Sequence, residues 1–263
     1  NGKTYSFGAG ENGRLGNNST ENVYIPTKIN CNKMIKIVSG STHAVGISED
    51  FKLYSCGDMK YNGHNLDDVF EFKELDFNGI LFEDVSIGPG GYHTIALTKS
   101  GEVYTWGHNR VGQLGFKSEK DETDDFFIHK CPKLVENIPP IIKISAGWGH
   151  SMLLTLDQNV LICGRMQESQ LGNIITSNGI QFYINDRDHK YNPYFNKLKI
   201  DFKVNDIISG GNHNAIFSEN EELYMWGSNE ENQLGIEKQT TNDLIKFSNY
   251  SNIQLGFSHT FFL

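Results

Sequence analysis

The hydrophobic residues of this chain fall into short runs of four to seven residues that are separated by Gly, Asn, Asp and Ser. Residues 94–98 (Thr-Ile-Ala-Leu-Thr) form one such run, and the polar turn Lys99-Ser100-Gly101 follows it. Apolar residues at the spacing of an amphipathic helix are almost absent, whereas short runs bounded by turn residues are typical of β-strands. The pattern therefore predicts an all-β protein.

One strand motif occurs five times along the chain. In each copy an apolar strand with an aromatic residue or Cys at its end is followed by Gly, and in four copies a Leu-Gly pair ends eight residues later. Successive copies are 49, 50, 57 and 63 residues apart, and long regular periods of this kind indicate solenoids, propellers or arrays. The glycines that end the strand are Gly8, Gly57, Gly107, Gly164 and Gly227.

A second motif, Gly-x-x-His, also occurs once in each copy. It follows an apolar or β-branched run, and another strand-like run comes directly after the His, such as residues 151–155 after His150. Each copy is thus made of short strands, which one small antiparallel sheet per copy accommodates. The five histidines are His43, His93, His150, His213 and His259.

Radial repetition of small sheets predicts a β-propeller. The chain begins at Asn1, shortly before the first strand motif, and ends at Leu263, shortly after the last His. We therefore expect residues 1–263 to form a single domain with five blades, in which residues 1–8 pair beside residues 259–263 and complete one shared blade. The alternative is a segment of a larger ring, which would leave an exposed sheet edge.

Composition narrows the classes of function. The net charge of −9, from 23 basic and 32 acidic residues, argues against direct nucleic-acid binding, because Lys and Arg supply most of the affinity for phosphates. No apolar run is long enough to span a membrane and no signal peptide is recognisable, so we expect no membrane insertion and a cytoplasmic or nuclear location. The four cysteines have no C-x-x-C spacing, which indicates reduced thiols rather than disulfides or a zinc site.

The two motifs together resemble the regulator of chromosome condensation (RCC-type) repeat. In the third copy, residues 101–115 read Gly-Glu-Val-Tyr-Thr-Trp-Gly-His-Asn-Arg-Val-Gly-Gln-Leu-Gly and residues 147–151 read Gly-Trp-Gly-His-Ser, which matches that repeat nearly position for position. The resemblance covers the whole chain and implies an RCC-type β-propeller. The kelch repeat fits less well, because its Gly-Gly doublet occurs in two of the five copies. The best known RCC-type propellers have seven blades, whereas this chain offers five copies.

The repeat histidines are interpreted as packing residues. A His that recurs at one position in every copy is expected to form hydrogen bonds to the backbone of a neighbouring blade, rather than to bind a metal or act as a general base. The sequence contains no phosphate loop, no Gly-x-Ser-x-Gly elbow and no His-Glu-x-x-His. We therefore expect no catalytic residues, no metal and no cofactor.

Partner binding is predicted where the copies deviate from the repeat, because loops on a rigid scaffold carry recognition. The longest insertion, residues 173–206, is predicted to be a loop rich in the residue types of interface hot spots, namely Phe182, Tyr183, Arg187, Tyr191, Tyr194 and Phe195. The residues between Gly and His form a second candidate surface at the mouth of the ring, namely Tyr92, Trp148, Asn212 and Phe257. Two acidic runs, 119–125 and 219–222, are interpreted as solvated loops or, alternatively, as segments that steer a basic partner.

These observations favour a protein-interaction propeller, a scaffold or adaptor, that binds a protein partner through one face and the inserted loops. The resemblance implies an alternative, guanine-nucleotide exchange on a small Ran-like GTPase, as the founding member of the family performs. In that mechanism a loop of the propeller competes with the phosphates and Mg²⁺ of the bound nucleotide and stabilises the nucleotide-free GTPase without a covalent step.

Overall fold

The structure is a computed structural model of the 263-residue chain. It describes residues 2–64, 67–118, 127–176, 179, 181–237, 240–248, 250 and 252–262. Apart from one 3-10 turn at Glu11–Gly13, all regular elements of these residues are β-strands, so the prediction of an all-β fold is confirmed. Within the described ranges, no helix is long and apolar enough to cross a membrane.

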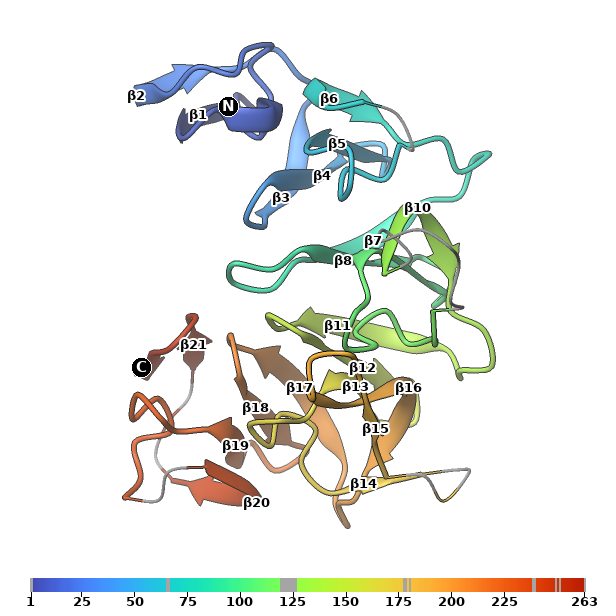
Figure 1. Cartoon of the computed structure of the whole chain (residues 1–263), viewed down its shortest axis with the longest axis vertical. Helices are drawn as coiled ribbons and strands as arrows, with labels where there is room; N and C mark the ends of the chain where they lie inside the picture. Colours follow the sequence, from blue (N-terminus) through green and yellow to red (C-terminus); the bar gives the residue numbers. More distant parts are fainter. Residues whose placement is uncertain are drawn as a thin grey trace.

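Three sheets are meanders of four antiparallel strands that are hydrogen-bonded in chain order (Figure 1). The first sheet contains β3 (Met34–Ser39), β4 (His43–Ser48), β5 (Leu53–Gly57) and β6 (Val69–Glu74). The second sheet contains β7 (Phe82–Ser86), β8 (His93–Thr98), β9 (Val103–His108) and β10 (Ile128–Leu134). The fourth sheet contains β17 (Val204–Ser209), β18 (His213–Ser218), β19 (Leu223–Ser228) and β20 (Thr240–Phe247).

The third sheet follows the same plan with two additional strands. Its meander contains β11 (Ile141–Ala146), β12 (His150–Thr155), β13 (Val160–Arg165) and β16 (Lys190–Leu198). The short strands β14 (Ile174–Ile175) and β15 (Tyr183–Ile184) both pair with β16. The prediction that residues 173–206 form a loop is therefore wrong for much of this insertion. A long insertion must satisfy its backbone donors and acceptors, and the edge of β16 offers partners for them.

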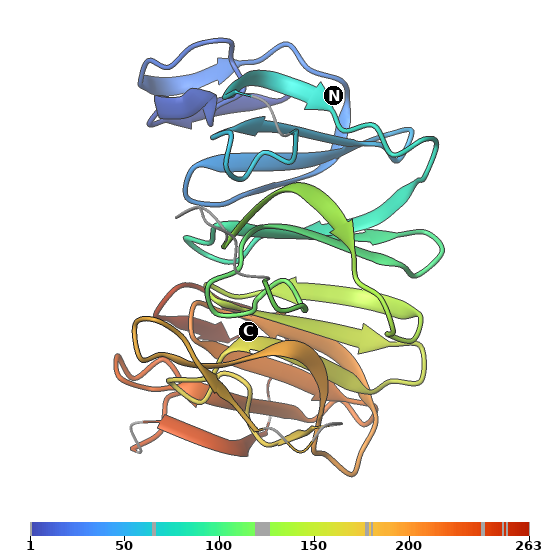
Figure 2. The same ribbon diagram turned by 45° about the vertical axis from the view of Figure 1, so that its right-hand side comes forward.

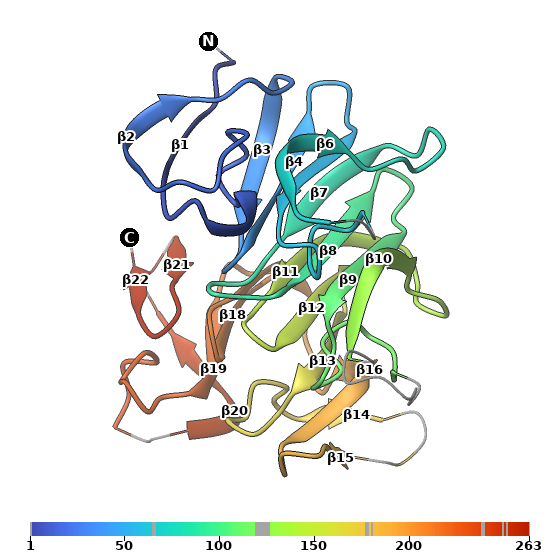
Figure 3. The same ribbon diagram turned by 45° about the horizontal axis from the view of Figure 1, so that its top comes forward.

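Two half-sheets lie at the two ends of this row of sheets (Figures 1 and 3). One pairs β1 (Tyr5–Gly8) with β2 (Val23–Lys28), and the other pairs β21 (Ile253–Leu255) with β22 (Thr260–Phe262). By their motifs, β1 and β2 are the third and fourth strands of a repeat, whereas β21 and β22 are the first and second.

The predicted shared blade is not formed, because the two half-sheets are separate sheets among the described residues. Residues 1 and 263, at the ends of the predicted pairing, lie outside the described residues. The physical reason lies in the packing between sheets. Side chains between neighbouring sheets set the angle from one sheet to the next, and here that angle does not bring β22 to β1.

The hydrophobic core lies between neighbouring sheets, which are stacked face to face (Figure 2). One cluster joins Val45 and Ile47 of the first sheet to Phe82 and Trp106 of the second, and equivalent clusters lie at the following interfaces. The second strand of each complete sheet is buried between two neighbours, and β4, β8 and β12 are buried along their whole length. This explains why these strands are mostly apolar on both faces and carry no acidic or Lys/Arg side chain.

The order of the strands places both candidate surfaces at one end of the sheets. In an antiparallel meander the first and third connections lie at one end and the second connection lies at the other. The first connections are the Gly-x-x-His loops, and the third connections include the insertion after β13. We call the end with these loops the mouth face, and the opposite end, which carries the turns between second and third strands, the far end.

Candidate functional site

The buried repeat histidines link each sheet to the next one. Every Nε2 bonds the side chain of the residue that directly follows the next repeat His. The expectation of a backbone partner was therefore wrong, although the bonds do join neighbouring sheets. The four pairs are His43 with Thr94 Oγ1 at 2.9 Å, His93 with Ser151 Oγ at 3.0 Å, His150 with Asn214 Oδ1 at 2.7 Å and His213 with Thr260 Oγ1 at 3.0 Å.

These contacts define the protonation state of the rings. Ser151 Oγ donates to the Gln113 carbonyl at 2.6 Å and therefore accepts from His93 Nε2, and Asn214 Oδ1 can only accept from His150. Burial is the main cause that lowers the pKa of His43 and His93 to about 3 and that of His150 and His213 to about 4. These four histidines are thus neutral at pH 7. His93, His150 and also His213, whose partner Thr260 Oγ1 donates to the Gln233 carbonyl at 2.7 Å, carry the proton on Nε2.

The glycines of the repeat make room for these rings. A Cβ on Gly147 would overlap Cε1 of His150, so only Gly leaves space for the imidazole. The strand-ending glycine Gly164 pairs across the sheet with His150 at a φ of 111°, in the left-handed region that favours Gly. Gly57, Gly107 and Gly227 hold the same position opposite His43, His93 and His213.

The fifth copy of this arrangement is split between the two half-sheets. His259 is exposed, and no described residue within 4 Å would meet a Cβ on Gly8. In the complete sheets the equivalent His and Gly face each other across two paired strands. Each half-sheet therefore lacks the strands that the other carries.

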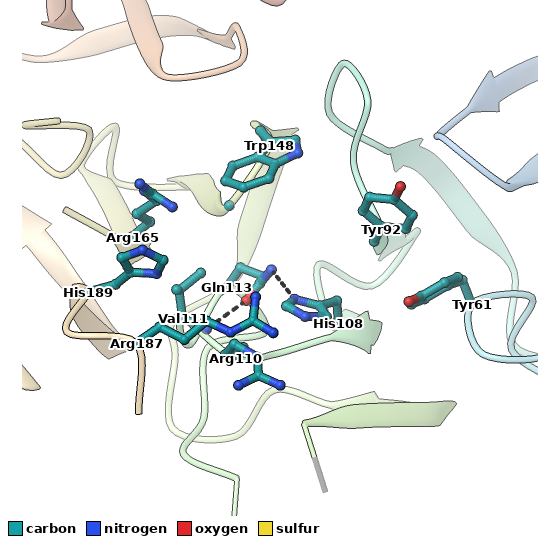
Figure 4. A pocket seen from close by; sticks show the side chains of 11 residues that line it. Tyr61, Tyr92, His108, Arg110, Val111, Gln113, Trp148, Arg165, Arg187 and His189 are labelled. Carbon is teal, nitrogen blue, oxygen red and sulfur yellow. Dashed lines mark hydrogen bonds between the residues drawn. The ribbon is translucent and has the colours of Figure 1, made fainter. Parts of the chain in front are cut away.

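A pocket of about 220 Å³ opens on the mouth face between the second and third sheets (Figure 4). Trp148 comes from the β11–β12 loop and Tyr92 from the β7–β8 loop, while Arg187 comes from the turn between β15 and β16. Tyr61 reaches the pocket from the first sheet and packs against Tyr92, with ring centroids 5.2 Å apart. The other lining residues are His108, Arg110, Val111, Gln113, Gly149, Arg165 and His189.

Two arginines of the pocket are held by carboxylates. Arg165 donates to Glu168 from Nε at 2.8 Å and from Nη2 at 2.6 Å, and its guanidinium lies 5.4 Å from the ring centroid of Trp148. Burial would raise the pKa of Glu168, but the hydrogen bonds and charge of Arg165 outweigh it and lower that pKa. Arg110 donates to Asp186 at 2.5 Å, which lowers the pKa of Asp186.

The orientation of His108 follows from its neighbour Gln113. Gln113 Oε1 accepts from the Val111 backbone N–H at 3.2 Å, so its Nε2 donates to His108 Nδ1 at 3.1 Å. The proton of the neutral His108 ring is therefore on Nε2. Burial, with the positive charges of Arg110 and Arg187, lowers the pKa of His108 to about 4.

The residues that were predicted to bind a partner, at the mouth and in the insertion, do not all lie in the pocket. Tyr92, Trp148 and Arg187 line the pocket together. Phe257 lies beside it, 46% exposed and in edge contact with Trp148 at 6.5 Å between ring centroids. Asn212 accepts a hydrogen bond from Gln170 at 3.1 Å and does not line the pocket.

The aromatic residues of the insertion lie outside the pocket. Tyr183 on β15 contacts Tyr191 and Tyr194 on β16, with ring centroids 5.8 and 6.3 Å away. Phe182 is exposed and lies under the ammonium group of Lys190. Phe195 is half-buried and packs against the core cluster between the second and third sheets, which favours a packing role over a partner contact.

Only one of the two acidic runs can be placed relative to the pocket. Residues 119–125 lie outside the described residues. Residues 219–222 form the turn between β18 and β19 at the far end, where Glu222 pairs with Lys246. Among the described residues, no group of three or more His, Cys, Asp or Glu side chains is placed to hold a metal ion.

Several residues of the pocket are not apparent from the sequence. Arg110 and Gln113 belong to the repeat motif, which favours a structural interpretation, and Arg165 directly follows the strand-ending Gly164. One signal is nevertheless present in the sequence. The chain has four arginines, Arg14, Arg110, Arg165 and Arg187, and three of the four line this pocket.

The fold and the repeated contacts define a β-propeller of tandem four-stranded repeats. The family model for the regulator of chromosome condensation (RCC1) repeat matches residues 1–47 and 100–154, and a second model of the same repeat matches residues 83–113 and 141–170. The chain belongs to the RCC1-repeat family, which confirms the resemblance inferred from its motifs.

Relatives and solved structures agree with this assignment. The chain is 28% identical over 245 residues to the human E3 ubiquitin-protein ligase HERC2, which is 88% of this chain and 5% of HERC2. It is 29% identical over 242 residues to the Arabidopsis thaliana ultraviolet-B receptor UVR8, covering 89% of this chain and 51% of UVR8. The crystal structure of Prp20p from Saccharomyces cerevisiae matches with a TM-score of 0.78 at 20% identity, over 98% of this chain and 63% of Prp20p. The chain thus spans about half of UVR8 and a small part of HERC2.

Proposed function

We propose that this chain is a protein-interaction propeller, a scaffold or adaptor, that binds a protein partner through its mouth face. The observation that carries the proposal is the mouth pocket, where Trp148, Tyr92 and Tyr61 lie next to the guanidinium groups of three arginines. Aromatic and Arg side chains dominate the hot spots of protein interfaces. In the described residues these arginines are not part of the core of the repeat, because they lie at the rim of the sheets rather than between them.

The rigidity of the scaffold supports the same proposal. Each mouth loop is anchored by its repeat His and by backbone bonds to the next loop, such as Trp148 N–H to the Gly211 carbonyl at 2.9 Å. Loops that are ordered before binding lose little conformational entropy when a partner docks. We place the protein in the cytoplasm or the nucleus and expect no direct contact with nucleic acid.

Affinity capture with matched variants tests this proposal. Trp148→Ala removes a half-buried aromatic side chain from the mouth, and Leu156→Ala removes a 63% exposed side chain from the far end. The Leu156→Ala variant should capture the same proteins from a lysate of the source cells as the wild type does. The Trp148→Ala variant should capture smaller amounts of these proteins. Equal capture by the wild type and both variants would argue against binding at the mouth face.

Guanine-nucleotide exchange on a small GTPase is the second candidate function. The observation that favours it is the fold shared with Prp20p, whose crystal structure was reported together with its binding properties to Gsp1p and histones. A captured GTPase, purified and loaded with labelled GDP, distinguishes the two functions. Exchange requires faster GDP release at catalytic amounts of the propeller, whereas a scaffold leaves the release rate unchanged.

A further inference from the structure

The mouth pocket concentrates positive charge on an acidic protein. Three of the four arginines of the chain line it, and in the part of the chain that the structure describes no Asp or Glu is among its lining residues. The chain as a whole carries a net charge of −9, so this concentration runs against the overall composition. Burial and, to a smaller extent, the charges of Arg110 and Arg187 lower the pKa of His108, so this ring stays neutral beside the arginines.

The guanidinium of Arg187 is available to a ligand. Arg110 and Arg165 are paired with Asp186 and Glu168 at the margin of the pocket. In the described part of the chain, the Arg187 side chain has no hydrogen-bond or ion-pair partner, and it extends into the pocket toward His108 and Gln113 (Figure 4). The Nε2–H of His108 likewise has no acceptor among the described residues. Two sets of donors therefore face the pocket, and they match a group that accepts hydrogen bonds.

The size of the pocket limits what such a group can be. Its volume of about 220 Å³ is below the roughly 300–1,000 Å³ typical of sites for drug-sized ligands and cofactors, so it suits one side chain. Carboxylates and phosphates match the planar fork of Arg in a bidentate geometry. The aromatic rings of Trp148 and Tyr92 beside the pocket provide surfaces on which the flanking residues of a peptide can pack.

We infer that this pocket binds an anionic side chain, a carboxylate or a phosphorylated residue, from an extended peptide segment of the protein partner. The inference rests on the proposed function and specifies what the mouth face recognises. Arg187 and His108 donate to the anion, Arg110 and Arg165 are held beside them by Asp186 and Glu168, and Trp148 covers the neighbouring residue of the peptide. The partner segment is therefore acidic, in contrast to the basic partner that the acidic runs of the sequence suggested.

Selection from a random peptide display library tests the inference before the partner is identified. Peptides selected on the wild-type protein should be enriched in Asp and Glu relative to the starting library. Arg187→Gln should abolish this enrichment, whereas Arg14→Gln, the same change at the one arginine outside the pocket, should retain it. Because the Arg187 side chain is exposed, its variant should melt within a few degrees of the wild type.

The selected peptide is then synthesised with Glu, phosphoserine or Gln at its acidic position, and binding is followed by the fluorescence of Trp148. This Trp lines the pocket while Trp106 and Trp226 are fully buried. The Gln peptide should bind at least about tenfold more weakly, as expected from the loss of a charged hydrogen bond, and comparing Glu with phosphoserine identifies the source of the anion. Peptides selected without acidic residues, or equal binding of the Gln peptide, overturn the anion site. If the Trp148→Ala variant still captures less protein than the wild type in that case, the proposed function holds without the anion site.

Discussion

At the scale of single residues, the repeat histidines join neighbouring sheets through hydrogen bonds between side chains. Replacing His150 with Ala removes the donor to Asn214 Oδ1 and leaves this buried acceptor unsatisfied. We expect the free energy of unfolding to fall by about 1–3 kcal/mol. The exposed His259 provides a matched control, since His259→Ala should change stability by less than about 0.5 kcal/mol. Equal losses in chemical denaturation would contradict the linking role.

The same histidines predict how stability depends on pH. Their folded-state pKa values are lowered to about 3 or 4, whereas an unfolded His titrates near about 6.5. Below about pH 6.5 the unfolded chain binds more protons than the folded chain, so the free energy of unfolding decreases as the pH falls toward the folded-state values. Thermal melts should show a falling Tm from pH 7 to pH 5, with a shallower slope for His150→Gln. A constant Tm over this range would contradict neutral, buried rings.

The recurrence of these histidines indicated a packing role, but their partners were not visible in the sequence. Thr94, Ser151, Asn214 and Thr260 each stand directly after the next repeat His, so a polar residue recurs there. To pair it with the preceding His, one must know how neighbouring sheets are aligned. That alignment depends on side-chain packing across the whole interface between two sheets. A single strand motif does not determine this packing.

At the scale of elements, β15 and β16 carry a cluster of tyrosines close to the mouth. Tyr194 is 39% exposed and Tyr191 is half-buried, and we propose that they contact the partner beside the pocket. Replacing both with Ser should weaken partner capture and leave the Tm within a few degrees, because exposed interface residues contribute more to binding than to folding. Phe195 is left unchanged, since it belongs to the core. Unaltered capture by the double variant would remove this cluster from the interface.

The strands of the repeat were predictable because their motifs recur, whereas the insertion was not. Residues 173–206 have no second copy to compare with, and their aromatic residues fit an exposed loop and a paired strand equally well. The pairing of Tyr183 with Tyr191 is settled by the edge of the third sheet, which becomes visible only when the sheet is assembled. Arg187 reaches the pocket for the same reason, because the β15–β16 turn directs it there.

At the scale of the whole molecule, the two half-sheets remain apart. If β22 and β1 paired as in the complete sheets, Phe261 would lie opposite Ser6, as Val45 lies opposite Ser55. The open arrangement predicts that Ser6→Cys with Phe261→Cys forms no disulfide bond under mild oxidation, because the two strands belong to separate sheets. Mass spectrometry of the digested protein would detect the cross-linked peptide. Formation of this cross-link in high yield would show that β22 and β1 pair in a shared blade.

The class of fold followed from the sequence, while the closure of the ring did not. Five copies of two motifs are enough to predict an RCC-type propeller, since each motif has a local structural cause such as the space that Gly147 leaves for His150. The angle between sheets is a sum over many interface contacts, and small changes in it decide whether β22 meets β1. The pocket arises in the same way, from Tyr61, Trp148 and Arg187 on three different loops.

Binding of the partner at the mouth face is tested most directly by hydrogen exchange of the complex. Backbone amides of the free chain and of the chain with its captured partner are compared by mass spectrometry. We expect slower exchange in the mouth loops around Tyr92, Trp148 and Arg187, with no change in the far-end turns at residues 156–159 and 219–222. Protection confined to the far-end turns, with unchanged exchange around Trp148, would contradict binding at the mouth face.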